Sequence, residues 1–114
     1  MREGTELKLK DKKIEIFAPV SVVNENGYAV THLQAICPPV WAYFRHLSGK
    51  EVFAAATINY KEEVLFQINY RIDITNAHVI RYNGVLYDIT RIDNFEGRKE
   101  DLKLFCARRA RQNL

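Results

Sequence analysis

The sequence has few of the residues that a disulfide scaffold or a membrane protein would need. It contains two cysteines, Cys37 and Cys106, whereas a small secreted protein held by disulfides normally carries more. We therefore expect a reducing compartment and free thiols. No apolar run approaches the roughly 20 residues that cross a bilayer, and the first 13 residues are charged with no apolar stretch behind them. We expect neither a signal peptide nor a contact with a membrane.

Sequence patterns that carry chemistry are also missing. The five glycines are scattered, so no loop can cradle a phosphate, and no G-x-S-x-G elbow is present. The histidines and cysteines never share the short spacing that pre-positions metal ligands. The acids Asp73, Asp88, Asp93 and Glu96 fall on predicted polar strand faces or in turns, where solvation explains them better than acid–base catalysis. We expect no metal, no cofactor and no catalytic site, and thus not an enzyme.

The composition is that of one folded domain with two basic ends. The chain has 114 residues, of which 47% are hydrophobic and 27% charged, as is usual for a globular domain. We interpret residues 1–114 as one domain, with residues 1–12 and 110–114 as flexible ends. Residues 1–13 hold five Lys/Arg against three acids, and residues 98–114 hold six against two. Basic side chains near the C-terminus, Arg108, Arg109 and Arg111, suit phosphates, although a solvated terminus is the better explanation of them from the residues alone.

Hydrophobic alternation predicts strands in the C-terminal half. Residues 64–74 have period two, which predicts one half-buried strand with these inward side chains: Val64, Phe66, Ile68, Tyr70, Ile72 and Ile74. The pair Asn83-Gly84 predicts a type I′ turn that joins strands over residues 77–82 and 85–93. A second hairpin is predicted, with a loop near residues 94–100 and a final strand in which Leu102, Leu104 and Cys106 alternate with other residues.

The N-terminal half predicts further strands and one helix. Residues 13–20 alternate, residues 24–27 are a turn signal, and residues 28–47 are rich in β-formers but interrupted at Pro38-Pro39. Trp41 is predicted to anchor the core. Ser48 and Glu51 form a capping box that predicts a helix over residues 48–56, followed by a loop over residues 57–63. We expect a mainly β fold, a small antiparallel barrel of about six strands with one short inserted helix and a long loop, a sandwich being the alternative.

Four blocks of sequence, in their order and spacing, resemble the siphophage head-tail joining (head-closure, head completion) family. They are Val40-Trp41-Ala42, Ser48-Gly49-Lys50-Glu51, residues 68–74 and residues 84–89. In the family the Trp-Ala pair ends a strand, the second block opens a helix, the third is a strand and the fourth is a hairpin strand before a final strand. The resemblance spans residues 12–109, although Asn69 stands where the family usually has arginine. The matching structural positions are Trp41, Ala42, Ser48, Gly49, Glu51, Arg71, Asp73, Gly84 and Tyr87.

The resemblance implies a structural protein of a phage or prophage virion. Its partners would be other copies of itself in a ring, the portal or adaptor ring above, tail-completion and tail proteins below, and the packaged DNA in the channel. It would reach the head-tail interface from the host cytoplasm. The loop expected to gate the channel is Thr57, Ile58, Asn59, Tyr60, Lys61, Glu62 and Glu63. The expected adaptor or DNA contacts are Arg108, Arg109 and Arg111.

Two other functions remain open from the residues. A tail-completion or tail-terminator subunit would share the same β-rich, ring-forming plan. An OB-like module for single-stranded nucleic acid would stack bases on aromatic side chains between arginines. The aromatic candidates for it are Trp41, Tyr43, Tyr60, Tyr70, Tyr82 and Tyr87. Acids alternate with arginines on the predicted strand faces, which argues against a nucleic-acid surface.

Overall fold

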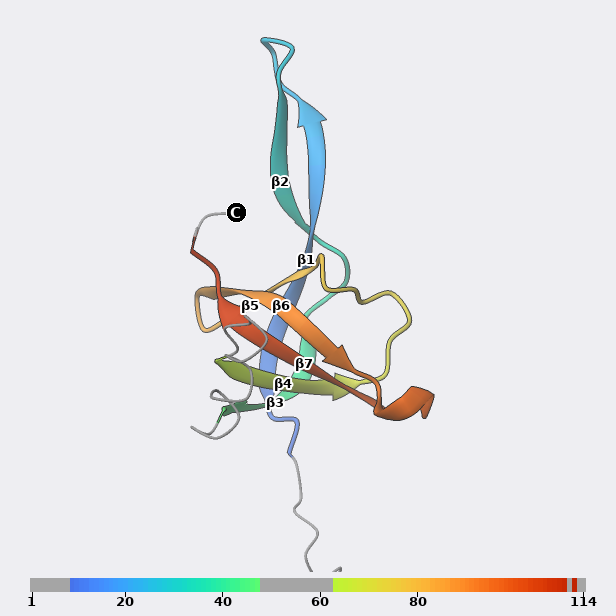
Figure 1. The fold of residues 1–114 in the computed structure, drawn as a ribbon. Helices are drawn as coiled ribbons and strands as arrows, with labels where there is room; N and C mark the ends of the chain where they lie inside the picture. The colour runs from blue at the N-terminus through green and yellow to red at the C-terminus, as the bar shows by residue number, and fades with distance from the viewer. Residues whose placement is uncertain (1–8, 48–62, 111, 113–114) are drawn as a thin grey trace, which may run out of the picture.

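The fold is a β-barrel from which one β-hairpin projects (Figure 1). In the computed structural model, residues 9–47, 63–110 and 112 are described. Within them lie seven strands and one 3-10 turn: β1 (Lys12–Val23), β2 (Ala29–Ala35), β3 (Val40–His46), β4 (Val64–Asn69), β5 (Val79–Tyr82), β6 (Val85–Asp93), η1 (Phe95–Gly97) and β7 (Asp101–Arg108).

All strand pairs are antiparallel, and six strands close into the barrel. The order β1-β3-β4-β7-β6-β5 is completed by a pairing between β1 and β5. Along β1, residues 12–14 pair with β3, residues 15–17 pair with β5, and residues 17–23 pair with β2. The prediction of a mainly β, six-stranded antiparallel barrel is confirmed, and the sandwich is excluded because closure leaves one continuous sheet.

The barrel interior is filled by branched and aromatic side chains that alternate along the strands. The buried cluster comprises Ile14, Ile16, Ala42, Val64, Phe66, Ile68, Ile74, Ile80, Ile89, Leu102, Leu104 and Cys106. Burial of a large aliphatic or aromatic side chain stabilises a fold by about 1.5–3 kcal/mol, so this cluster is the main source of stability. The predicted alternation of inward side chains is confirmed in β7 and in the first part of β4. The prediction that β4 is half-buried is wrong, because Leu65 and Gln67 on its other face are buried as well.

Both predicted hairpins and the proline break are confirmed. Asn83 and Gly84 have φ of 56° and 81°, as a type I′ turn requires, and join β5 to β6. Residues 94–100 connect β6 to β7. Pro38 and Pro39 lie between β2 and β3, where no ladder hydrogen bond is needed from a proline nitrogen.

The predicted strand over residues 64–74 is too long. β4 ends at Asn69, which pairs with Asp101, the first residue of β7. Beyond this pair the Tyr70 N–H still donates to the Glu100 carbonyl at 3.2 Å, but residues 71–74 have no ladder partner, and an alternating pattern without one does not form a strand. Ile72 consequently points into solvent, 88% exposed, although Ile74 returns to the core. The third family-like block is therefore a loop after its first two residues.

The prediction that Trp41 anchors the core is wrong. Its neighbour Ala42 is fully buried, and because successive side chains of a strand point to opposite faces, Trp41 faces outward and is 54% exposed. Trp41 and Ala42 also open β3, whereas the resemblance implied that they end a strand. The predicted helix over residues 48–56 and the loop up to residue 62 lie outside the described residues. Cys37 is half-buried, Cys106 is buried, and both are free thiols.

Candidate interaction surfaces

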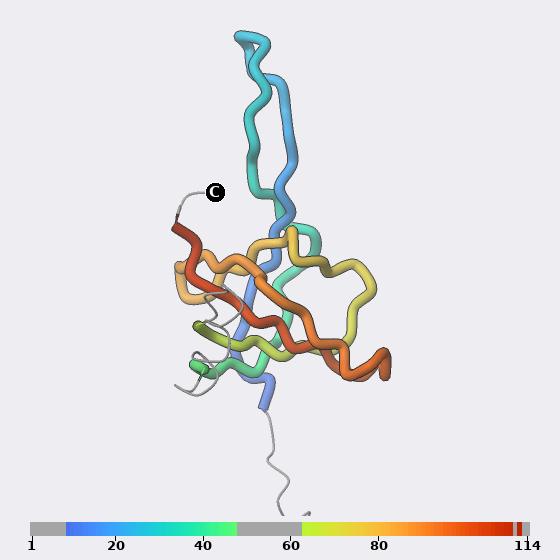
Figure 2. Tube along the Cα trace, viewed as in Figure 1, coloured from blue at the N-terminus to red at the C-terminus, as the bar shows by residue number. Residues whose placement is uncertain are grey.

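The outer part of the β1–β2 hairpin, residues 18–35, forms an arm outside the barrel. Its strands pair with each other from Ala18↔Gln34 to Val23↔Ala29. Every residue from 21 to 29 is exposed, and no described segment lies beside the outer part of the arm in Figure 2. A two-stranded hairpin alone is marginal in water, so this arm depends on its anchorage or on a partner.

The base of the arm is anchored on the outer surface of the barrel. Leu33 packs against the buried residues Phe17, Val79 and Leu86. Beside them, the Arg81 guanidinium donates to both carboxylate oxygens of Glu15 at 2.7 and 3.0 Å. The hydrogen bonds from Arg81 hold the pKa of Glu15 below its usual range. These contacts fix the direction in which the arm leaves the barrel.

The tip of the arm is an ordered turn with exposed apolar side chains. The Asn24 side-chain oxygen accepts from the backbone N–H groups of Asn26 and Tyr28, both at 3.0 Å. Gly27 supplies the positive φ of 83° that the turn requires. The apolar side chains Val22, Val23 and Tyr28 are 43%, 72% and 69% exposed. The turn thus holds them in a defined geometry.

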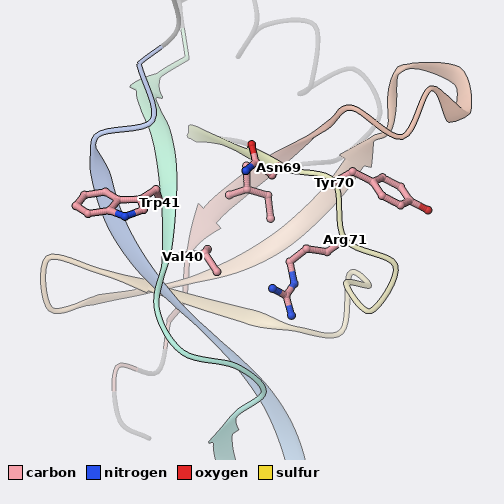
Figure 3. A pocket seen from close by; sticks show the side chains of 6 residues that line it. Val40, Trp41, Asn69, Tyr70 and Arg71 are labelled. Atoms are coloured by element: carbon pink, nitrogen blue, oxygen red, sulfur yellow. The ribbon is translucent and has the colours of Figure 1, made fainter.

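A second exposed apolar feature is a hollow beside Trp41, which we name the Trp41 groove. It has a volume of about 310 Å³ and is lined by Val40, Trp41, Ile68, Asn69, Tyr70 and Arg71. Figure 3 shows Trp41 at one side and Tyr70 at the opposite side. The Lys13 ammonium lies 4.9 Å from the centre of the Trp41 ring, so the indole is positioned by a cation–π contact.

Polar contacts hold the rim of the Trp41 groove. The Lys10 ammonium donates to Asn69 at 2.8 Å and to Asp101 at 2.9 Å. Arg71 makes two hydrogen bonds with Asp73, at 2.9 and 2.8 Å, and these lower the pKa of Asp73. The two family-like positions Arg71 and Asp73 therefore stabilise the loop after β4, and the groove is pre-formed.

The two residues that flank the segment 48–62 are joined at one end of the barrel. The Leu47 N–H donates to the Glu63 carbonyl at 3.0 Å, and the Glu63 carboxylate accepts from the Arg108 N–H at 2.8 Å. A hollow of about 390 Å³ lies here, lined by His46, Glu63, Val64, Tyr87 and Arg108. Burial raises the pKa of Tyr87, whose ring contacts Phe66.

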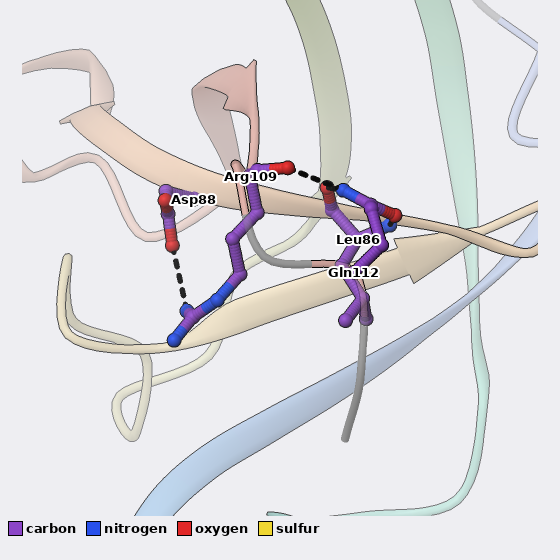
Figure 4. Close-up of polar contacts among 4 residues, drawn as sticks. All are labelled: Leu86, Asp88, Arg109 and Gln112. Carbon is purple, nitrogen blue, oxygen red and sulfur yellow. Dashed lines mark hydrogen bonds and ion pairs between the residues drawn. The ribbon is translucent and has the colours of Figure 1, made fainter.

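Two described residues after β7, Arg109 and Gln112, contact the barrel. Arg109 donates to the Asp88 carboxylate at 2.8 Å, and the Gln112 side chain pairs with both backbone groups of Leu86, at 2.8 and 2.9 Å (Figure 4). Arg71, Arg81 and Arg109 are thus each paired with an acid of the same chain. The aromatic platform of the OB-like hypothesis gains no support, because Tyr82 and Tyr87 are half-buried against Phe66.

Some predicted site residues come together and others do not. Trp41 and Arg71 meet at the Trp41 groove, and Glu63 meets Arg108 at the barrel end. Ala42 is in the core and Gly84 is in a turn. Outside the described residues lie Ser48, Gly49, Glu51, Thr57, Ile58, Asn59, Tyr60, Lys61, Glu62 and Arg111.

The sequence patterns did not predict the arm. The turn signal at residues 24–27 was visible, but alternation does not reveal that the strands beside it extend past the barrel. The low charge of this segment could have indicated the arm, because residues 18–35 contain one charged side chain, Glu25. A two-sided hairpin in water normally carries more charge on its edges.

The described ranges hold no cluster of three or more His, Cys, Asp or Glu side chains that could bind a metal ion. In the same ranges, no helix is long and apolar enough to span a membrane.

Comparison with known proteins identifies a family and similar solved structures. The sequence model of the phage head completion protein family matches residues 10–109. Protein SF1141 from Shigella flexneri 2a, solved in solution, has a TM-score of 0.76 at 18% identity, over 93% of this chain and 98% of that one. A chain in the virion of a native gene transfer agent particle has a TM-score of 0.52 at 15% identity, over 84% of this chain and 91% of that one. No curated protein matches the sequence significantly.

Proposed function

The chain belongs to the phage head completion protein family, and from that premise we propose that it is the head-closure subunit of the connector, assembled as a ring beneath the portal or adaptor. It is a structural protein of the phage head-tail region. The observation that carries the proposal is the family match over residues 10–109, which includes all seven strands. In this role the ring retains the packaged DNA and presents the surface to which the tail binds.

The geometry of the barrel suits a ring subunit. Its six strands close on themselves, so the backbone groups of the barrel are paired internally and the body is rigid without a partner. Surfaces for neighbours then have to come from projecting elements. Among the described residues the arm is such an element, and it leaves the barrel at a different place from Leu47 and Glu63.

The loop of residues 57–63 is our candidate for closing the channel. The hydrogen bonds of Leu47 and Glu63 hold the two flanking residues together on the rigid end of β3 and β4. A segment that starts and ends at one fixed point can change conformation without disturbing the barrel, which is what a gate between closed and open states requires. The exposed Arg108 beside Glu63, together with Arg109 and Arg111, is the proposed contact with the adaptor or DNA.

Electron microscopy of particles made without this gene tests the head-closure role. We expect DNA-filled or leaking heads that accumulate apart from complete tails, and recovery of joined virions when the wild-type gene is supplied in trans. Normal virions in the absence of the gene would contradict the proposal. Headless tails of abnormal length beside correctly closed heads would favour the tail-terminator alternative.

Deletion of residues 58–62 tests the loop assignment separately. The barrel contacts of Leu47 and Glu63 remain, so the subunit should still fold and join the particle, while the heads should lose DNA. A matched control is replacement of Asn83-Gly84 by Asp-Gly, which keeps a type I′ turn and should leave the particles intact. Leak-proof, DNA-filled heads from the deletion would contradict the assignment.

A further inference from the structure

The chain carries two apolar surfaces that its own described fold leaves uncovered. One is the arm tip, with Val22, Val23 and Tyr28 in solvent, and the other is the Trp41 groove. Exposed aromatic and aliphatic side chains next to a pre-formed hollow are typical of the centre of a protein interface. Both surfaces are held in place by hydrogen bonds or ion pairs, so little ordering would be needed on contact.

The two surfaces are kept apart within one copy. Trp41 lies opposite Lys13 on β1, and Val23 lies ten residues further along the same strand. At the rise of a β-strand this separation is about 33 Å, along an element that the barrel and the arm base hold rigid. Figure 3 shows β1 running away from the hollow toward the arm. The tip of one copy therefore cannot reach its own groove.

The charge of the arm selects a protein partner over DNA. Residues 18–35 contain no lysine or arginine and a single acid, Glu25. Phosphate binding depends on basic side chains, and the arm offers none. Beyond Phe17 both edges of the arm are unpaired within the described chain. These edges also lack the charged residues that normally keep an open edge from pairing with other chains.

We propose that the arm is an intersubunit contact, in which the tip of one copy packs into the Trp41 groove of the adjacent copy in the ring. The inference rests on the proposed ring. Tip and groove are different surfaces of the same chain, so the contact is heterologous, and each copy gives one tip and receives another. Contacts of this kind generate rings when the rotation closes, and in a closed ring every tip and every groove is covered.

Site-specific photo-crosslinking in assembled virions tests the contact. Tyr28→p-benzoylphenylalanine places a photoreactive group at the tip of the arm in the full-length chain. Illumination should give covalent multiples of the 13.3 kDa chain, with linked peptides at residues 40–41 or 69–71. The control is Glu96→p-benzoylphenylalanine, at an exposed position in the β6–β7 loop, which should give no such links.

Each other outcome overturns the contact. Links from residue 28 to a portal, adaptor or tail protein would mean that the arm binds a different ring, while the head-closure role would stand. Chain-to-chain links that avoid residues 40–41 and 69–71 would place the tip on another surface. If the subunit is absent from the virions, the proposed function fails together with the contact.

Variants of Trp41 test whether the tip of the arm binds in the Trp41 groove. In the Tyr28 photo-crosslinking chain, Trp41→Ala should lower the yield of chain multiples by about tenfold or more, as expected for an aromatic residue at an interface centre. Trp41→Phe should retain most of it. Circular dichroism verifies that both variants fold, which the exposure of Trp41 predicts. An unchanged yield with Trp41→Ala would exclude the groove.

Discussion

The barrel and the arm share one strand, β1, but place its apolar side chains in opposite environments. Ile14, Ile16 and Phe17 are buried in or against the barrel, whereas Val22 and Val23 are in solvent. The backbone pairing does not weaken at this point, since residues 17–23 pair continuously with β2. The barrel is therefore stabilised by burial within the chain, whereas the arm leaves apolar side chains exposed.

The largest effect should come from truncation of the barrel core. Phe66→Ala removes a fully buried ring that contacts Phe44, Tyr82 and Tyr87, so the free energy of unfolding should fall by about 3–5 kcal/mol. Urea denaturation measures this loss. Val23→Ala, at a 72% exposed position of the arm, should change the same quantity by less than about 0.5 kcal/mol. Equal losses in the free energy of unfolding from the two substitutions would contradict the difference between the barrel and the arm.

An intermediate effect is expected where the arm joins the barrel. Leu33 is partly buried against Phe17, Val79 and Leu86, so Leu33→Ala should lower the free energy of unfolding by about 1–2 kcal/mol, less than a fully buried leucine. Hydrogen exchange of the amides in β2 should also become faster. Gln34→Ala, next in sequence and exposed, is the control. If Leu33→Ala leaves both quantities unchanged, the arm is not anchored by this cluster.

A small effect on stability, combined with a loss of assembly, is expected when the arm is shortened. Replacement of residues 20–32 by Asn-Gly removes a segment without a single buried residue, so the free energy of unfolding should change by less than about 1 kcal/mol. Complementation of a particle that lacks the gene should nevertheless fail. Joined virions from the shortened chain would show that the arm has no role between subunits.

The smallest effect concerns the ion pair at the base of the arm. Because Arg81 lowers the pKa of Glu15, the pair stabilises the fold above the ordinary pKa of glutamate, about 4.5, and this contribution disappears as the pH falls through the lowered value. Both side chains are about one third exposed, so screening limits the contribution to about 1 kcal/mol or less.

Urea denaturation of wild type and Glu15→Gln, from neutral pH down to about pH 3, measures this contribution. The wild type should be more stable at neutral pH, and the difference should shrink in acid. Added salt should also reduce it. A difference that grows as the pH falls would contradict the assigned direction of the pKa shift.

The elements that the sequence predicted correctly are those set by residues close together in the chain. The turn at Asn83-Gly84 follows from the positive φ that this pair tolerates, and β7 follows from the alternation of Leu102, Leu104 and Cys106. Residues 71–74 alternate equally well, but they are not a strand, because β7 begins opposite Asn69 and leaves them without a ladder partner. Alternation indicates that a segment can form a strand, but the strand forms only where a neighbouring strand pairs with it.

The outward position of Trp41 and the length of the arm depend on tertiary structure. Trp41 is apolar enough for the core, and only the register that places Ala42 inside determines that it faces outward. The ordered blocks of sequence indicated the family, and the match over residues 10–109 confirms it. They contained no information on the arm, because residues 18–35 lie outside all four blocks.

Electron cryo-microscopy of the head-tail joint in intact virions tests the central claim most directly, because it locates the arm of every copy at once. We expect a ring beneath the portal or adaptor, with Tyr28 of each copy against Trp41 of its neighbour. An arm that projects into solvent, or that lies on a different protein while Trp41 remains uncovered, would contradict it.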